Sequence, residues 1–210
     1  MNLLVTRPEH DDTTHYLSSY CEPTLEFAHS KGHKVLDLHR EKAVKMDVES
    51  GLRKFQAKFV VFNGHGDYHQ VAGHKNEVLI TEGENDKLLK DKVVYAISCR
   101  CGNILGPRSV EKGALSFTGY NEDFYFYYEP KLISKPKKDK TVALFLEPTQ
   151  RFIRAVLKGN SVQEAEQKAQ EQMKDNLIKS LSFEDTSIAK YLWWDLKHMV
   201  TYGNKNMKLD

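Results

Sequence analysis

The chain has 210 residues, of which 40% are apolar, so it can build one hydrophobic core, and we expect a single domain over residues 1–210. Its mean hydropathy is −0.58, and no apolar run approaches the roughly 18 residues that a membrane span needs, which excludes a membrane protein. The net charge of +2 leaves no basic patch for nucleic acid, and residues 1–8 lack a secretory signal, so we expect a cytoplasmic location.

Short apolar segments predict a series of buried strands in the first 120 residues. They are Leu3–Val5, Lys34–His39, Lys58–Asn63, Val93–Ser98 and Ala114–Thr118. Helical patterns separate most of these strands, at Thr14–Lys31 with a break near Pro23, Val44–Phe55 and Asn103–Lys112. Apolar strands that alternate with helices are typical of an α/β fold, in which helices cover both faces of a mainly parallel sheet. We expect five or six strands.

The remaining segments are less regular. Residues 64–92 form a long loop, with a possible hairpin near Glu77–Thr81 and a short helix at Asp86–Leu89. Val142–Leu146 predicts a sixth strand, although a helix also fits, and Pro148–Leu157 predicts a helix. Ser161 and Glu164 form a capping box for the following helix, and the last helix spans about Glu184–Tyr202.

Two predicted strands run directly into reactive side chains. The strand ending at Asn63 is followed by Gly64-His65-Gly66, and the strand ending at Ser98 is followed by Cys99. Carboxyl ends of neighbouring parallel strands meet at one edge of a sheet, so His65 and Cys99 are expected to lie side by side if the two strands are neighbours. An imidazole can take the proton of a thiol and create a nucleophile. Gly66 and Cys99 can offer backbone amides to an oxyanion.

These motifs resemble those of the caspase-like cysteine peptidases, which include caspases, gingipains, separase and the bacterial CHAT proteases. The matching segments are Asn63-Gly64-His65-Gly66, Ala96–Gly102, Gly113–Gly119 and Phe152–Ala165. The resemblance extends from about Lys58 to Ala169. It implies a three-layer caspase-like sandwich, with His65 as catalytic histidine, Cys99 as nucleophile, Gly66 in the oxyanion hole and no cofactor.

In this family the residue before the cleaved bond enters a pocket beside the nucleophile. The corresponding loops here, with the segment after His65, contain the candidate substrate-binding residues Arg7, Asp11, Asp12, Asp67, Asn121, Glu122 and Asp123. Because acidic residues outnumber the single arginine, we expect cleavage after Arg or Lys, whereas a dominant Arg7 would favour an acidic residue. The expected partners are a protein or peptide substrate and a regulatory protein.

Other readings of the same residues stay open. His65, Asp67, His69, His74, Cys99 and Cys101 are the residue types that bind zinc, but their spacings match no familiar zinc pattern. A Cys-His amidotransferase places its histidine after the nucleophile, in the reverse of the order seen here. A catalytically inactive caspase-like scaffold or binding module is a further alternative. For Cys101 the sequence allows two interpretations, a packing role in the core or a redox-active disulfide with Cys99.

Overall fold

The computed structural model describes residues 1–183 and 186–209. Its main sheet has six strands in the order β2-β1-β3-β7-β8-β9, and all but the last run parallel. The strands are β1 (Asn2–Arg7), β2 (Lys34–His39), β3 (Phe59–Asn63), β7 (Val93–Ile97), β8 (Ser116–Tyr120) and β9 (Met199–Gly203). The expected mainly parallel sheet is therefore confirmed, with one antiparallel strand at its edge.

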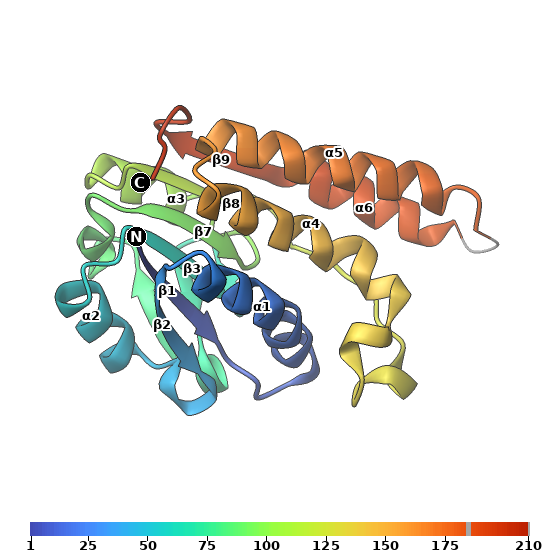
Figure 1. Ribbon diagram of the computed structural model, residues 1–210, viewed down its shortest axis with the longest axis horizontal. Coiled ribbons are helices and arrows are strands. Elements are labelled where there is room, and N and C mark those ends of the chain that lie inside the picture. The colour runs from blue at the N-terminus through green and yellow to red at the C-terminus, as the bar shows by residue number, and fades with distance from the viewer. Residues whose placement is uncertain (184–185, 210) are drawn as a thin grey trace.

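Helices cover both faces of this sheet (Figure 1). They are α1 (Asp12–Ser30), α2 (Lys45–Lys54), α3 (Leu105–Glu111), α4 (Lys140–Leu157), α5 (Val162–Ser180) and α6 (Ser187–His198). Short 3₁₀ helices lie in the connections between these elements, at η1 (Arg40–Lys42), η2 (His74–Asn76), η3 (Asp86–Leu89), η4 (Pro130–Leu132) and η5 (Pro136–Lys138).

Alternate residues of each central strand enter different cores, as the two-residue period of a strand requires. Leu3 and Val5 of β1 pack in the core beneath α1, α4 and α5, whereas Leu4 packs in the core beneath α2 and α3. Because both faces are buried, the middle residues of these strands are apolar without alternation. The three-layer α/β arrangement thus follows directly from the strand sequences.

Two predictions differ from the structure where it forms long helices. The helix expected to break at Pro23 continues through it as α1, because nine buried residues anchor the helix on both sides of the proline. The strand expected at Val142–Leu146 is part of α4, which Asp139 caps through the amides of Thr141 and Val142. The segment is apolar because two sides of the helix are buried, and not because it is a strand buried on both faces. Val142 and Leu146 face the sheet core, while Leu144 and Phe145 face α6.

Two further expectations are corrected, one for the long loop 64–92 and one for the last helix. The long segment 64–92 holds a second sheet of three strands, β4 (Gly66–Asp67), β5 (Gln70–Ala72) and β6 (Val78–Thr81). The last helix stops at His198, and the residues after it form β9, whose backbone pairs with β8. The expected start of that helix at Glu184 lies outside the described residues. The capping box of Ser161 and Glu164 and the short helix at Asp86–Leu89 are confirmed.

Candidate active site

The carboxyl ends of β1, β3, β7 and β8 meet at one edge of the main sheet, because these strands are parallel and adjacent. Asn63 at the end of β3 pairs with Ile97 at the end of β7. The strands that lead into His65 and Cys99 are therefore neighbours, as expected from the sequence. The loops after β1 and β8 border the same edge.

Gly66 brings the histidine loop against the cysteine loop. A Cβ atom at Gly66 would lie 2.9 Å from the Cβ of Ser98 and 3.0 Å from the carbonyl oxygen of Cys99, so no larger residue fits there. The amide of Ala72 donates to the carbonyl of His65 over 2.8 Å. In an antiparallel pair the next residue then directs its amide away from the partner strand, which leaves the Gly66 amide outside the β4–β5 ladder.

The side chain of His65 is bonded to Asp11, the residue that caps helix α1. Nε2 of His65 lies 2.7 Å from Oδ2 of Asp11, and both side chains are 37% exposed. The other carboxylate oxygen, Oδ1, accepts hydrogen bonds of 2.8 Å from the amide and the hydroxyl of Thr14. With Nε2 held by Asp11, Nδ1 is the nitrogen of His65 that remains to take up a proton.

The charge on Asp11 follows from these contacts. Partial burial opposes ionisation of the carboxyl, but hydrogen bonds from the Thr14 amide and from His65 outweigh it and lower the pKa of Asp11. The residue is therefore a carboxylate at neutral pH. It can hold the imidazole in one orientation and stabilise its protonated form.

Cys99 is held as a thiol. Its Sγ donates to the carbonyl oxygen of Phe124 over 3.8 Å. Burial raises the pKa of Cys99 to about 11, and the neighbouring carboxylate of Asp123 disfavours the thiolate as well. Within the described part of the chain, no hydrogen bond joins Cys99 to His65. A base must therefore reach the thiol before it can act as a nucleophile.

Three of the candidate substrate-binding residues are engaged within the fold. Arg7 is 5% exposed and forms two hydrogen bonds, of 2.9 and 2.6 Å, with Asp37. Asp12 accepts a hydrogen bond from the hydroxyl of Tyr128, and Asp67 accepts one from the amide of His69. The Arg7 side chain lies inside the protein, where a substrate does not reach it.

The candidates after β8 lie closer to the cysteine. Asn121 Oδ1 is 2.9 Å from Nδ1 of His198, and the carbonyl of Glu122 accepts the amide of Arg100. Asp123 is bonded to Arg100 over 2.6 Å, and this pair is partly exposed. Asp123 is thus the acidic candidate that lies beside Cys99.

The residues proposed from the sequence as zinc ligands are not gathered at one point. Among the described residues, the group whose ligand atoms lie within 4.8 Å of one another is His10, Asp11 and His65. Cys101 is fully buried in the core beneath α2 and α3, and its thiol donates to the carbonyl of Ser98. All three cysteines are free, which favours packing over a redox bridge for Cys101.

Sequence reasoning missed the role of Asp11 next to His65. The family resemblance places Asp11 in the substrate pocket, and the sequence does not specify the order of the strands in the sheet. The structure places β1 beside β3, with Thr6 opposite Phe62, so the loop that follows β1 runs past His65. The aspartate at the start of the predicted first helix was the available signal.

The mainly parallel six-stranded sheet, with helices on both faces, has the caspase-like α/β fold that is seen in gingipain. No protein-family model and no curated protein sequence matches the chain. Solved structures do match it over 98–99% of its length. In the described residues, no helix is both long and apolar enough to traverse a bilayer.

Two of the matching structures are of gingipain R. A complex of the pro- and mature domains of RgpB from Porphyromonas gingivalis has a TM-score of 0.62 at 8% identity. The crystal structure of the Arg-specific cysteine proteinase gingipain R gives 0.57 at 9%, and a structure described as a protease gives 0.64 at 14%. The chain spans 47–48% of the length of these three proteins. At such low identity, the similarity establishes the fold alone.

Proposed function

We propose that this protein is a cysteine endopeptidase in which Cys99 attacks the peptide carbonyl and His65 moves the proton. The observation that carries the proposal is the junction of β3 and β7, where Gly66 of the histidine loop touches Ser98 and the Cys99 backbone. A thiol and an imidazole that leave neighbouring parallel strands, on a gingipain-like fold, fit nucleophilic catalysis of acyl transfer.

The first half of the reaction forms an acyl-enzyme. Because burial keeps Cys99 protonated, His65 must take the thiol proton on Nδ1 as the substrate binds, when the Phe124 contact gives way. The thiolate then forms a bond to the carbonyl carbon, and the carbonyl electrons move to oxygen. The protonated His65 gives its proton to the leaving amine as the C–N bond breaks.

The second half returns the enzyme to its starting state. Water loses a proton to His65 and attacks the thioester, and the proton then returns to the sulfur as the acid product leaves. The amides of Gly66 and Cys99 donate to the oxyanion in both halves. Asp11 acts as a positioning residue, because its carboxylate holds Nε2 and stabilises the imidazolium.

Asp123 supports a preference for a basic residue before the cleaved bond. Its carboxylate lies beside Cys99 and is paired with Arg100 over 2.6 Å. An arginine of the substrate can take the place of Arg100, since a guanidinium group forms bidentate hydrogen bonds with a carboxylate. The structural similarity to a proteinase described as Arg-specific agrees with this assignment.

Covalent labelling tests the proposal. Peptidyl electrophiles that differ only in the residue next to the reactive group, Arg, Lys or Asp, are incubated with the wild type and with Cys99→Ala, His65→Ala and Cys101→Ala. We expect Arg and Lys probes to label the wild type and Cys101→Ala, with labelling abolished in Cys99→Ala and strongly slowed in His65→Ala. Cys101→Ala is the matched control, because it removes a thiol two residues away.

The outcomes separate the alternatives. Folded wild type that no probe labels would favour the inactive scaffold. Labelling by the Asp probe alone would overturn the basic preference while leaving the nucleophile intact. Equal labelling of the wild type and Cys99→Ala would reject Cys99 as the nucleophile.

A further inference from the structure

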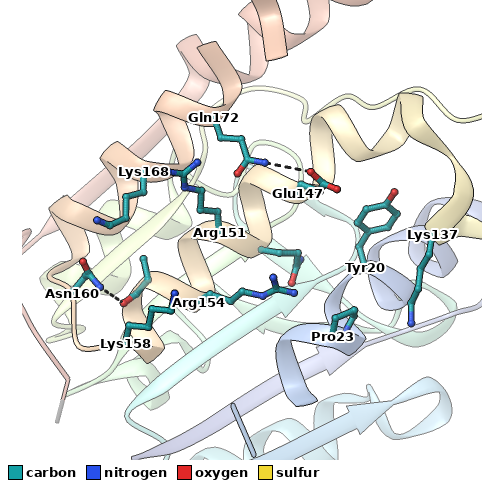
Figure 2. Close-up of a pocket in the computed structure, with 12 residues that line it drawn as sticks. Tyr20, Pro23, Lys137, Glu147, Arg151, Arg154, Lys158, Asn160, Lys168 and Gln172 are labelled. Carbon is teal, nitrogen blue, oxygen red and sulfur yellow. Dashed lines mark hydrogen bonds between the residues drawn. The ribbon is translucent and has the colours of Figure 1, made fainter. Parts of the chain in front are cut away.

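A cavity of about 690 Å³ lies between helices α1, α4 and α5, and it shares no residue with the candidate active site. Figure 2 shows basic side chains of α4 and α5 gathered around it. Its volume is within the range that small-molecule sites occupy. Such sites are mostly apolar, however, whereas this one is lined by charged and amide side chains. Its composition therefore points to a polar, charged ligand.

Five basic residues line the cavity against one carboxylate, that of Glu147. The basic residues are Arg151 and Arg154 of α4, Lys158 at the C-cap of α4, Lys168 of α5, and Lys137 of η5.

Arg151, Arg154 and the C-cap residue Lys158 lie three and four positions apart, so they share one side of α4. Lys137 is paired with Glu22 over 2.7 Å. The other four form no ion pair with any described residue. Glu147 in the cavity wall and Glu164 near Lys168 offset their mutual repulsion only in part, and a bound anion would reduce it further.

Gln150, which lines the same cavity, has an acceptor atom without a hydrogen-bond donor. Gln150 lines the cavity and is 4% exposed. Its Nε2 donates to the hydroxyl of Thr149 over 3.2 Å, whereas its Oε1 is buried with no hydrogen-bond partner among the described residues. Buried acceptors are rarely left without a donor. A hydroxyl or amino group of a ligand would satisfy this acceptor if the Gln150 side chain shifts towards the cavity, because Oε1 itself exposes almost no surface.

We propose that this cavity binds a small polyphosphorylated molecule that also carries hydroxyl groups, of the nucleoside triphosphate class. The phosphates lie among Arg151, Arg154, Lys158 and Lys168, and a hydroxyl or amino group of the remainder donates to Gln150. This inference stands apart from the peptidase proposal, because it rests on a different cavity and needs no catalysis.

Calorimetric titration of the whole chain tests the inference. The probes are ATP, inorganic triphosphate and adenosine, in magnesium-free buffer at constant ionic strength. We expect ATP and triphosphate each to bind at one site, with ATP tighter, and adenosine to bind far more weakly than either. The double variant R151Q/K168Q removes one charge from each of α4 and α5, and it should weaken both phosphate ligands at least about tenfold.

The matched control is K174Q/K179Q, which removes two charges from exposed positions of α5 outside the cavity. It should change neither affinity more than about threefold, because distant exposed charges are screened. Gln150→Leu should weaken ATP and spare triphosphate. Thermal melting identifies any variant that fails to fold.

Three results would overturn the inference. They are an absence of binding of both phosphate ligands to the wild type, an equal loss in R151Q/K168Q and in K174Q/K179Q, and adenosine binding as tight as that of ATP. If Gln150→Leu weakens ATP and triphosphate alike, Gln150 does not recognise the hydroxyl-bearing part, and the ligand class is wrong. Since none of these readouts involves peptide hydrolysis, they are independent of whether Cys99 is a nucleophile.

Discussion

Asp11→Asn is the substitution that most directly probes the proposed mechanism. Asparagine keeps an oxygen that can accept the Thr14 amide, so the cap of α1 is retained and stability should change by less than about 1 kcal/mol. The charge opposite His65 is lost, however, along with its stabilisation of the imidazolium. The substitution thus separates the electrostatic role of Asp11 from its structural role.

The size of the effect follows from the 2.7 Å contact between Nε2 and Oδ2. Unit charges at that distance attract by about 1.5 kcal/mol in water and about 6 kcal/mol at an effective dielectric constant near 20. Both side chains are 37% exposed, so solvent screening reduces the interaction, and we take about 2–4 kcal/mol. If this stabilisation is present only when His65 is protonated, kcat falls by about 30- to 1,000-fold.

The assay is steady-state hydrolysis of a fluorogenic arginyl peptide, with kcat and KM measured separately. We expect kcat to fall in Asp11→Asn while KM and the melting temperature stay close to the wild-type values. Asp12→Asn is the control, because it removes the adjacent, exposed carboxylate, which contacts Tyr128 and not His65. A kcat within about threefold of the wild type in Asp11→Asn, or an equal loss in Asp12→Asn, would refute the positioning role.

Three other predictions test the pocket, the fold and the chemistry. Asp123→Asn should raise KM for arginyl peptides about tenfold or more, and an unchanged KM would remove Asp123 from the pocket. Glu9 is partly buried, which opposes its ionisation, but the contact with His39 and the hydrogen bonds from Arg40 and Ser18 lower its pKa to about 2. A lowered folded-state pKa stabilises the fold above the unfolded-state value near 4.5, and this contribution is lost as the pH falls towards 2. Chemical denaturation should therefore show Glu9→Gln to be less stable than the wild type by about 3 kcal/mol at pH ~7, with the difference shrinking below pH ~4. Lastly, a chelator should leave peptide hydrolysis unchanged, since the mechanism uses a thiol and an imidazole. Loss of hydrolysis in chelator, restored by added zinc, would instead favour the zinc hydrolase.

The sequence predicts those parts of the fold in which a local sequence pattern is compatible with only one local structure. Val60, Val61 and Phe62 are apolar without alternation, which requires a strand buried on both faces, and β3 is such a strand. Ser161 and Glu164 can satisfy each other's backbone amides only at a helix start. These local rules placed His65 and Cys99 at strand ends.

Other parts could not be predicted, because the deciding contacts are distant in the sequence. The run at Val142–Leu146 is apolar on two sides because α6 packs on the second side, and hydropathy cannot distinguish that from a buried strand. Met199–Gly203 becomes a strand because β8 offers it an open edge. Asp11 reaches His65 only because β1 pairs with β3 in the sheet, and no local sequence pattern specifies this strand order.

The two oxygens of Asp11 link the start of helix α1 to a side chain in the loop after β3. Oδ1 holds the first turn of α1 through Thr14, and Oδ2 holds the ring of His65. Any lengthening of the turn between Arg7 and Asp11, or fraying of that first helical turn, would release the imidazole to rotate. An insertion there can therefore abolish the proposed alignment of His65 without altering His65 or Cys99, which makes the length of this connection a constraint on engineering the protein.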